Sequence, residues 1–435
     1  MNNAKKAICN GMIFTGKGFC KGTILIKKNK INSVIFENIP SETWQKAGYS
    51  IIDANSCIVS YGFFDPHVHF RCPGAAHKED WQTGSKAALA GGFTFIGDMP
   101  NNSPAATNFD ILKLKSTLPK SYPINYGLYV GLTDENAKDI KKIINKARRH
   151  GINILGIKCF IGSSTGNLLI KDDNSIYEAL KTGEQVLFHC EDQRTLDKTA
   201  HIPYQTVLDH NNIRPVSAEI EGLHRIIRAA APIKDKAKIY ICHISAKDTM
   251  RQIKKYREQG YTITTEVSPH HLFFSMSNII ADNIYKVNPP IRTETDVTYL
   301  RNKFNKGKFK IIGSDHAPHL LAEKQSDNPP SGFPGLETSF YALHNLVERN
   351  ILDIKRVLKC LTSGYKIFGI KKRGKIKKGN YADITIIKPQ PHVVKAAETY
   401  TKADFTPYEN LKTNMSIDTV ILNGEIVYKG GKFEE

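Results

Sequence analysis

The sequence lacks any apolar run close to the roughly 18 consecutive residues that a membrane-spanning helix requires. Its first residues, 1–6, precede an apolar stretch that is too short to be a secretory signal. It also contains no internal repeat and no low-complexity linker. We therefore expect a globular protein of the cytoplasm with no membrane partner.

The chain has eight cysteines but lacks any CxxC pair. A zinc ribbon needs such pairs, and a disulfide framework is typical of short secreted domains, so neither is indicated. We expect the thiols to be reduced, as is usual in a cytosolic protein.

Acidic residues are the scarcer charged class: 42 aspartates and glutamates stand against 61 lysines and arginines, for a formal net charge of +19. Such a charge invites a nucleic-acid-binding interpretation. The lysines, however, are spread along the chain among asparagines and isoleucines, and the densest run, 371–378, lies at an apparent domain boundary. We therefore expect no nucleic-acid partner and a solvated basic surface that mildly attracts anionic substrates.

Short apolar runs alternate with helix-like segments through the middle of the chain. Two of these segments, Asp134–His150 and Ala246–Gln259, have the pattern of amphipathic helices. Eight βα units over about 310 residues favour an α/β fold of the TIM (β/α)8 type over an open doubly wound sheet. The expected strands are Ile58–Phe64, Phe93–Met99, Ile124–Val130, Ile154–Phe160, Gln185–His189, Lys238–Ile244, Tyr261–Val267 and Phe309–Ser314.

Both ends of the chain carry β-like runs separated by turn signals, for example residues 22–26 and 419–428. Chain termini are often close in space. We therefore expect residues 1–57 and 372–435 to form one small β-sandwich, attached to a barrel of residues 58–371.

Residues 65–71 read Asp-Pro-His-Val-His-Phe-Arg and directly follow the first apolar run. Side chains at positions i and i+2 of a strand point to the same side, so His67 and His69 would present two imidazoles to one point. Histidine is the commonest metal ligand, and Arg71 adds a fixed positive charge with the same parity. The same pattern could come from two polar histidines that bind no metal. A metal site therefore requires further ligands from other parts of the chain.

Further ionisable residues end other expected strands, namely Lys158, His189, His243 and Asp315. A TIM barrel keeps its active site at the C-terminal ends of its strands. Any one of these residues could be a hydrogen-bonded core residue, but so many buried polar groups at one mouth would be costly as packing alone.

Three cysteines each follow or precede one of these residues by one position. Strand alternation would turn the thiols of Cys159, Cys190 and Cys242 outward, toward the helices. We therefore expect them to be small buried hydrophobic groups and not ligands.

Lys158 allows two interpretations. A cationic ammonium would be repelled among metal-bound histidines. A neutral amine can instead add carbon dioxide, and the resulting carbamate is an anionic ligand able to bridge two metals. The alternative is a lysine that binds an anionic substrate.

Longer motifs accompany these residues. They are His69–Arg71 with Pro73-Gly74, Gly91–Thr94, Asp98–Asn101, Gly162–Asn167, Asn288–Pro290 and Ser314–His319. Together with the strand-end residues they resemble the amidohydrolase superfamily and, in detail, its dihydroorotases. The resemblance covers nearly the whole chain.

The resemblance implies two zinc ions per subunit. The implied ligands are His67, His69 and Asp315 for the more buried ion, His189 and His243 for the second, and carboxylated Lys158 as the bridge. It also implies that Arg71, Asn101 and His319 bind a substrate carboxylate, with further contacts from Asn288 and from the backbone around Pro334 and Gly335. The loop Gly162–Asn167 would lie where it can close over the site.

The chain departs from the family at two positions. Cys72 stands where the family usually has Glu, and Asn102 where it usually has Thr. Neither position is an implied ligand, so the departures bear on loop packing and leave the chemistry intact.

The implied reaction interconverts N-carbamoyl-L-aspartate and L-dihydroorotate in pyrimidine biosynthesis. A hydroxide bridging two metals about 3.5–4 Å apart would be the nucleophile, and Asp315 would carry its proton to the leaving nitrogen. The substrate is then a small molecule with a carboxylate, for which the planar fork of Arg71 is suited.

Related enzymes are the nearest alternatives, because allantoinases and dihydropyrimidinases or hydantoinases share the metal core. Arg71, Asn101 and His319 together favour a carboxylate-bearing substrate over a neutral ring. A non-catalytic barrel that acts as a structural partner would usually have lost metal ligands, and this chain retains them. The oligomeric state, a homo-oligomer included, the metal used in the cell and the direction of flux stay open.

Overall fold

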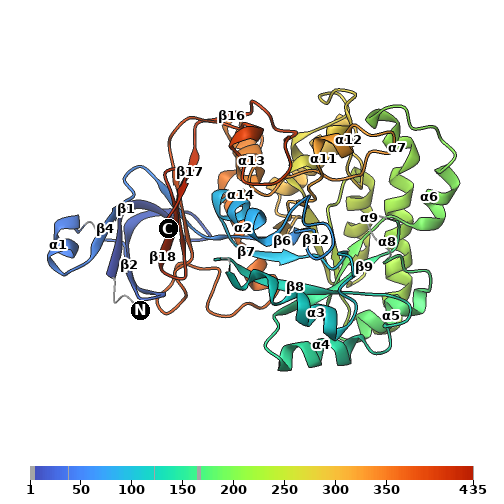
Figure 1. Ribbon diagram of the computed structural model, residues 1–435, viewed down its shortest axis with the longest axis horizontal. Coiled ribbons are helices and arrows are strands. Elements are labelled where there is room, and N and C mark those ends of the chain that lie inside the picture. The colour runs from blue at the N-terminus through green and yellow to red at the C-terminus, as the bar shows by residue number, and fades with distance from the viewer. Residues whose placement is uncertain (1–4, 38, 122, 164–167, 435) are drawn as a thin grey trace.

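The structure is a computed structural model that describes residues 5–37, 39–121, 123–163 and 168–434 (Figure 1). Two units lie side by side in it: a large α/β unit and a smaller β-rich unit that holds both chain ends. No helix among the described residues is both long and apolar enough to cross a membrane.

The α/β unit is built on eight parallel strands that neighbour one another in chain order. They are β6 (Phe63–Val68), β7 (Phe93–Asp98), β8 (Asn125–Gly131), β9 (Ile154–Phe160), β10 (Gln185–His189), β11 (Lys238–Ile241), β12 (Ile263–Val267) and β13 (Ile311–Ile312). The ring is nearly closed, since a parallel bridge joins Val68, in β6, to His316, just after β13. The predicted TIM-barrel fold is confirmed.

Helices cover the outside of this barrel (Figure 1). The longer ones are α2 (Trp81–Ala90), α3 (Phe109–Lys115), α4 (Ile140–Arg149), α5 (Asp173–Lys181), α6 (Gln193–Thr199), α8 (Val216–Ala230), α9 (Lys247–Glu258), α11 (Glu294–Asn305), α13 (Ser339–Glu348) and α14 (Ile354–Thr362). The short ones are α7 (His210–Ile213), α10 (Pro269–Phe273), α12 (Leu321–Lys324) and α15 (Gly364–Ile367). One more short helix, α1 (Ser41–Lys46), belongs instead to the β-rich unit (Figure 1). The expected helices therefore exist, although α4 begins only at Ile140, six residues after the expected start.

The interior of the barrel is filled below the mouth by one apolar cluster. Most of the strands contribute to it, through residues that include Phe64, Phe95, Tyr129, Leu187 and Tyr240. Each of these lies earlier in its strand than the polar residues at the strand ends. The cluster therefore closes the lower barrel and leaves the C-terminal mouth for chemistry.

Strands from both chain ends share one mixed sheet of nine strands. Its path is β19 (Lys432–Phe433), β18 (Glu425–Lys429), β17 (Ser416–Leu422), β14 (Ile384–Lys388), β5 (Ile58–Tyr61), β1 (Lys5–Phe14), β2 (Phe19–Lys27) and β3 (Lys30–Ile35), with β4 (Ser50–Asp53) beside β1. A separate pair is formed by β15 (His392–Val393) and β16 (Lys412–Thr413). The exact bounds of the two domains stay a prediction.

The expected strand Ile58–Phe64 is in fact two strands. Its first half, β5, pairs with β1 and β14 in the mixed sheet, and only its second half enters the barrel as β6. Gly62 lies between them, and a Cβ at this position would overlap the side chain of Thr94. The close approach at this glycine is where the chain passes from one sheet to the other.

Candidate active site

The site begins at the end of β6, beside the seam with β13. The Nε2 atoms of His67 and His69 each lie 3.3 Å from Oδ1 of Asp315. A tetrahedral ion with bonds of about 2.0–2.2 Å holds its ligands about 3.3–3.6 Å apart. These three side chains therefore fit a metal ion, and they form a group whose ligand atoms all lie within 4.8 Å of one another.

His189 and His243 make a second pair of nitrogen atoms. Nδ1 of His189 lies 3.1 Å from Nε2 of His243, and the ring centroids are 4.9 Å apart. His243 also stands next to the first group, with its ring 5.3 Å from that of His67. The two nitrogen atoms of the pair can serve one further ion, adjacent to the first.

Burial lowers the pKa of all four imidazoles, those of His67, His69, His189 and His243. Neighbouring cationic groups, chiefly Lys158 and Arg71, add to this effect. Metal ligation requires an unprotonated nitrogen. The environment of the site thus holds these side chains in the form that binds metal.

Lys158 is close enough to both groups to lower the pKa of histidines in each. It is fully buried in β9, its Nζ is 3.2 Å from Sγ of Cys242, and the ammonium stands 5.0 Å from the Phe160 ring. Among the described residues, no carboxylate lies within ion-pair distance of its Nζ. A buried cation with a thiol and an aromatic ring as neighbours is costly, so this side chain suits conversion to an anion.

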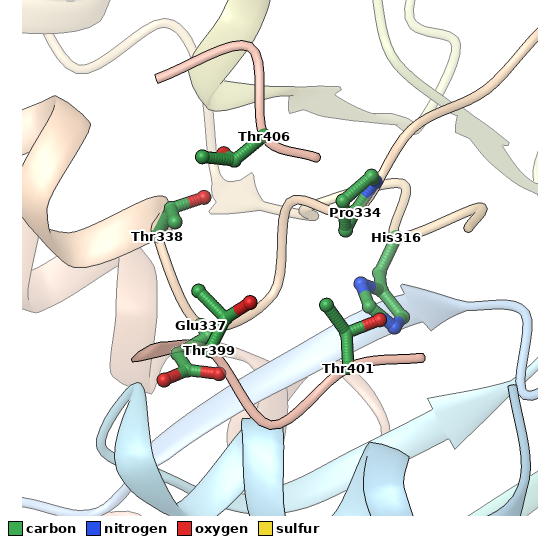
Figure 2. A pocket seen from close by; sticks show the side chains of 7 residues that line it. All are labelled: His316, Pro334, Glu337, Thr338, Thr399, Thr401 and Thr406. Atoms are coloured by element: carbon green, nitrogen blue, oxygen red, sulfur yellow. The ribbon is translucent and has the colours of Figure 1, made fainter. Parts of the chain in front are cut away.

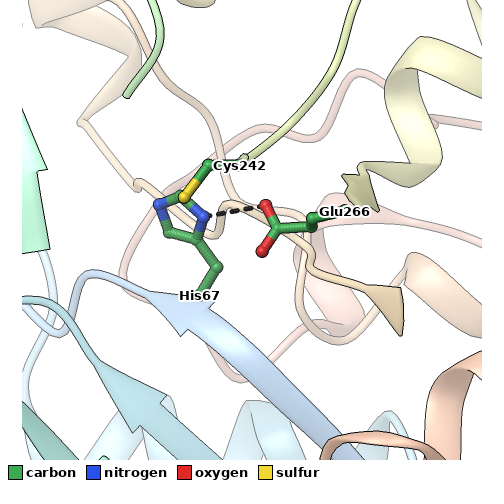
Figure 3. Close-up of side chains that lie close together, drawn as sticks. All are labelled: His67, Cys242 and Glu266. Carbon is green, nitrogen blue, oxygen red and sulfur yellow. Dashed lines mark hydrogen bonds and ion pairs between the residues drawn. The ribbon is translucent and has the colours of Figure 1, made fainter. Parts of the chain in front are cut away.

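The orientation predicted for Cys242 is wrong, whereas Cys159 and Cys190 do pack in the cluster between strands and helices. Cys242 points into the barrel, beside His67 and Glu266 (Figure 3). The reason is local: Tyr240 and Cys242 share strand parity and both face the barrel interior, and alternation breaks only at the next residue, His243, which has a left-handed φ of 28°.

Glu266, at the end of β12, is a functional residue that sequence reasoning missed. Its Oε1 lies 3.0 Å from Nδ1 of His67 (Figure 3) and accepts the backbone N–H of His243 at 2.9 Å, while Oε2 accepts the Tyr240 hydroxyl. Burial would raise the pKa of this carboxyl, but His67 and the other donors outweigh it and lower the pKa. An acidic residue near the end of an expected strand was the available signal.

Glu191 and Arg214 were also missed. Nε2 of His189 lies 2.9 Å from Oε2 of Glu191, and Arg214 donates to both oxygens of that carboxylate. Burial opposes ionisation of Glu191, but Arg214 and His189 hold its pKa well below the ordinary range. The pair fixes the His189 ring with Nδ1 toward His243. Glu191 is two residues after His189, so strand alternation would place both side chains on the same side. This spacing could have identified Glu191 from the sequence.

Two of the predicted carboxylate-binding residues meet beside the first histidine pair. Nη2 of Arg71 lies 3.1 Å from Nε2 of His319, and Nε of Arg71 donates to the Pro318 carbonyl. The third, Asn101, has its Oδ1 2.7 Å from Nδ1 of His69. Burial lowers the pKa of Arg71 to about 10, so its guanidinium stays charged at neutral pH.

Asn288 is hydrogen-bonded to residues outside the groups described above. Its Oδ1 accepts hydrogen bonds from Nε2 of His210 at 2.8 Å and from the Ser331 hydroxyl at 3.0 Å. The backbone N–H of Gly335 donates to Nδ1 of His316 at 3.2 Å. The predicted substrate contacts of Asn288, Pro334 and Gly335 therefore stay predictions, and the Gly335 amide hydrogen already has an acceptor.

A small cavity adjoins Pro334 and His316 (Figure 2). Its volume is about 10 Å³, and Glu337 and four threonines complete its wall. This space is about that of one water molecule, so it is too small for a ring substrate. The predicted closing loop Gly162–Asn167 falls largely outside the described residues, which omit 164–167.

Comparison with known proteins identifies the protein family of this chain. The model of the amidohydrolase family matches residues 58–427. The chain belongs to the amidohydrolase family. It is 33% identical over 405 residues to a dihydroorotase of Methanosphaera stadtmanae, covering 88% of this chain and 90% of that one. It is 31% identical to a dihydroorotase of Pyrococcus furiosus, covering 97% and 92%.

Solved structures share the fold. A dihydropyrimidinase from Brevibacillus agri superimposes with a TM-score of 0.87 at 23% identity, covering 99% of this chain and 96% of that one. An L-hydantoinase from Arthrobacter aurescens gives 0.88 at 21% identity, covering 99% and 97%. Family and relatives together make this amidohydrolase an enzyme that acts on a cyclic amide and binds metal.

Proposed function

We propose that this amidohydrolase is a dihydroorotase, which opens the ring amide of L-dihydroorotate to N-carbamoyl-L-aspartate and closes it in reverse. The relatives named above support this assignment. The observation that carries it is the contact between Arg71 and His319, whose Nη2 and Nε2 atoms lie 3.1 Å apart near the proposed metal ligands.

The Arg71–His319 pair suits a carboxylate attached to the ring. Both side chains are largely buried, at 7% and 2% exposed. A neutral ring would leave their N–H groups desolvated without acceptors, which costs about 1–3 kcal/mol for each group. A site built around buried donors rejects an analogue that lacks the matching acceptor.

We infer that two zinc ions occupy the site. His67, His69 and Asp315 would hold one ion, His189 and His243 the other, and carboxylated Lys158 would bridge them. Such ions make a water molecule nucleophilic at neutral pH and polarise the amide carbonyl.

Side chains of the protein carry out the proton transfer and bind the substrate carboxylate. Burial raises the pKa of Asp315, which suits a carboxylate that takes a proton and returns it to the leaving nitrogen. Its backbone is held in a left-handed conformation with φ of 51°, an uncommon state for a residue other than glycine. Arg71, with φ of 48°, shares this feature and holds the carboxylate end of the substrate.

Dihydropyrimidinase and hydantoinase activities are the alternative, since the solved structures with this fold carry those names. Their identity of 21–23% supports the fold alone. The Arg71–His319 pair distinguishes the two assignments, because a substrate without a carboxylate would not use it. The net basic charge would also favour approach of the anionic substrate.

Steady-state kinetics on purified protein tests the assignment. We expect kcat/KM for L-dihydroorotate to exceed that for dihydrouracil, hydantoin and allantoin by about 10⁴-fold or more, as for sites that bind a polar group of the substrate. Arg71→Met should reduce turnover of dihydroorotate far more than that of an uncharged ring. The exposed Arg251, which pairs with Asp248, provides the control variant Arg251→Met.

Equal efficiency of the unaltered enzyme on dihydrouracil or allantoin would overturn the dihydroorotase assignment and leave the amidohydrolase fold in place. Metal analysis of the same preparation separates an enzyme from a non-catalytic barrel, because only the former needs bound metal.

A further inference from the structure

Lys78 lies next to the pair that we assign to the substrate carboxylate, in the segment between β6 and α2. Its Nζ is 3.1 Å from Nδ1 of His319 and 2.8 Å from Oε1 of Glu323. The side chain is largely buried, at 19% exposed. His319 thus has a cationic group against each of its ring nitrogens: Arg71 at Nε2 and Lys78 at Nδ1.

These contacts cannot all be hydrogen bonds at once. Guanidinium and ammonium groups only donate, and a neutral imidazole has one nitrogen that accepts. Burial, Arg71 and Lys78 hold the pKa of His319 far below its ordinary value, so the ring is neutral. The ring N–H of His319 therefore faces an N–H of Arg71 or of Lys78, and the Ser331 carbonyl is a further acceptor close to the ring.

Two arrangements of the ring proton compete. With the proton on Nδ1, the ring faces Glu323, whose Oε2 lies 3.5 Å away, and Nε2 accepts from Arg71. That Oε2 already accepts the backbone N–H of Leu320 at 3.0 Å. With the proton on Nε2, Nδ1 accepts from Lys78 at 3.1 Å and the Nε2–H group points at Arg71.

A carboxylate oxygen resolves the conflict. Placed between Arg71 and His319, it accepts from both, which requires the proton of His319 to be on Nε2. Nδ1 is then an acceptor, and Lys78 is the donor that faces it. Glu323 holds the Lys78 ammonium in place and balances its charge, so the pair adds no net charge to the site.

We propose that Lys78 is a positioning residue for the substrate carboxylate, which it serves by donating to Nδ1 of His319 and so fixing the tautomer whose Nε2–H binds the substrate. This inference rests on the proposed function, because it needs a carboxylate on the substrate. Lys78 and Glu323 would then determine substrate specificity through His319, without touching the substrate ring.

Kinetics of Lys78→Met test the proposal. We expect KM for L-dihydroorotate to rise about 10- to 100-fold, as for loss of a charged hydrogen bond, with kcat and zinc content near those of the unaltered enzyme. Lys78→Arg keeps a cationic donor and should restore most of the loss. Lys86→Met, at an exposed position of α2, is the matched control and should change nothing.

Turnover of dihydrouracil separates positioning from a general structural role. Its kcat/KM should be the same in Lys78→Met as in the unaltered enzyme, since this ring carries no carboxylate. The proposal would be overturned if the variant lost zinc and had a lower kcat and a higher KM on both substrates. An unchanged KM for dihydroorotate would also overturn it. Failure of the unaltered enzyme to turn over dihydroorotate would instead reject the proposed function.

A direct observation covers the case in which Lys78→Met does not fold. In ¹⁵N-histidine-labelled unaltered enzyme with bound orotate, which keeps the ring and the carboxylate, His319 should be in the Nε2–H tautomer. The His319→Asn variant assigns the signals. Presence of the Nδ1–H tautomer in the orotate complex would overturn the proposal.

Discussion

Glu266 holds His67 from behind: its Oε1 lies 3.0 Å from Nδ1 of that ring and leaves Nε2 directed at Asp315. The same oxygen accepts the backbone N–H of His243. One buried carboxylate therefore orients a proposed ligand of the first ion and the backbone of a proposed ligand of the second.

Replacing this carboxylate should weaken metal binding without removing a ligand. We expect Glu266→Gln to lower zinc affinity about 10- to 100-fold, because a carboxylate that accepts the N–H of a ligating histidine fixes the orientation of its ring. Competition with a chelator measures the affinity. Glu258→Gln, at the exposed end of α9, is the control. An unchanged affinity would show that the His67 ring is fixed by packing alone.

Lys158→Met removes the proposed bridge but keeps a long buried side chain. We expect loss of most bound metal and of about 10²-fold or more in activity, since a structured metal site depends on its full ligand set. Elemental analysis and mass spectrometry of the unaltered protein, which should carry carbon dioxide on this lysine, check the idea. Full metal content and rate in the variant would contradict it.

Asp315→Asn tests the proton carrier. Asparagine keeps the shape but cannot take a proton, so we expect turnover to fall about 10²- to 10⁴-fold while the protein still folds. The pH–rate profile is the informative measurement. If hydrolysis continues with the profile of the unaltered enzyme, a different group is the base.

A carboxylate far from the site gives a pH-dependent contribution to stability. Glu184 lies 2.6 Å from Lys141 and 2.8 Å from Arg148. Partial burial would raise its pKa, but the hydrogen bonds from Arg148 and Lys141 outweigh burial and lower it. A lowered pKa in the folded state stabilises the protein above the unfolded pKa of about 4.3.

This contribution is lost as the pH falls through the folded pKa. We therefore expect Glu184→Gln to lower the free energy of unfolding by about 1 kcal/mol at pH 7, with a smaller difference at pH 3. Denaturant unfolding of both proteins without metal measures it. A difference that is as large or larger at pH 3 would refute the sign.

The mixed sheet predicts the outcome of a truncation. Deletion of residues 372–435 removes β14, which pairs with β5 along residues 384–387, together with β17 to β19. The apolar side chains of Val59, Ile8 and Ile24, now packed with Ile384, would then be exposed beside an open sheet edge. Light scattering should show aggregation, and a soluble, monodisperse, equally stable product would contradict a shared β unit.

Sequence reasoning located the site because its main signals are local. Strand parity brings His67 and His69 to one side, and barrel topology brings strand ends together, so their meeting with Asp315 follows from chain order. The roles of these residues as ligands stay a prediction, although their distances fit.

The failures have equally local causes. The orientation of Cys242 was wrong because it was inferred from His243, whose left-handed backbone breaks the alternation that Tyr240 and Cys242 still follow. Glu266 offered only a single acidic residue near the end of its strand, with no partner at a fixed spacing. The contact of Lys78 with His319 joins residues 241 positions apart through two irregular segments, which no periodicity describes.

The ring of strands is weakest between β6 and β13, where a single bridge and the His69 N–H to His316 carbonyl bond close it. Asp65 supports this seam by accepting the backbone N–H groups of His67 and Ser314. His67 and His69 stand on one side and Asp315 on the other. An ion held by all three would cross-link the two sides of this seam. Metal binding would then both complete the active site and stabilise the closed ring of strands.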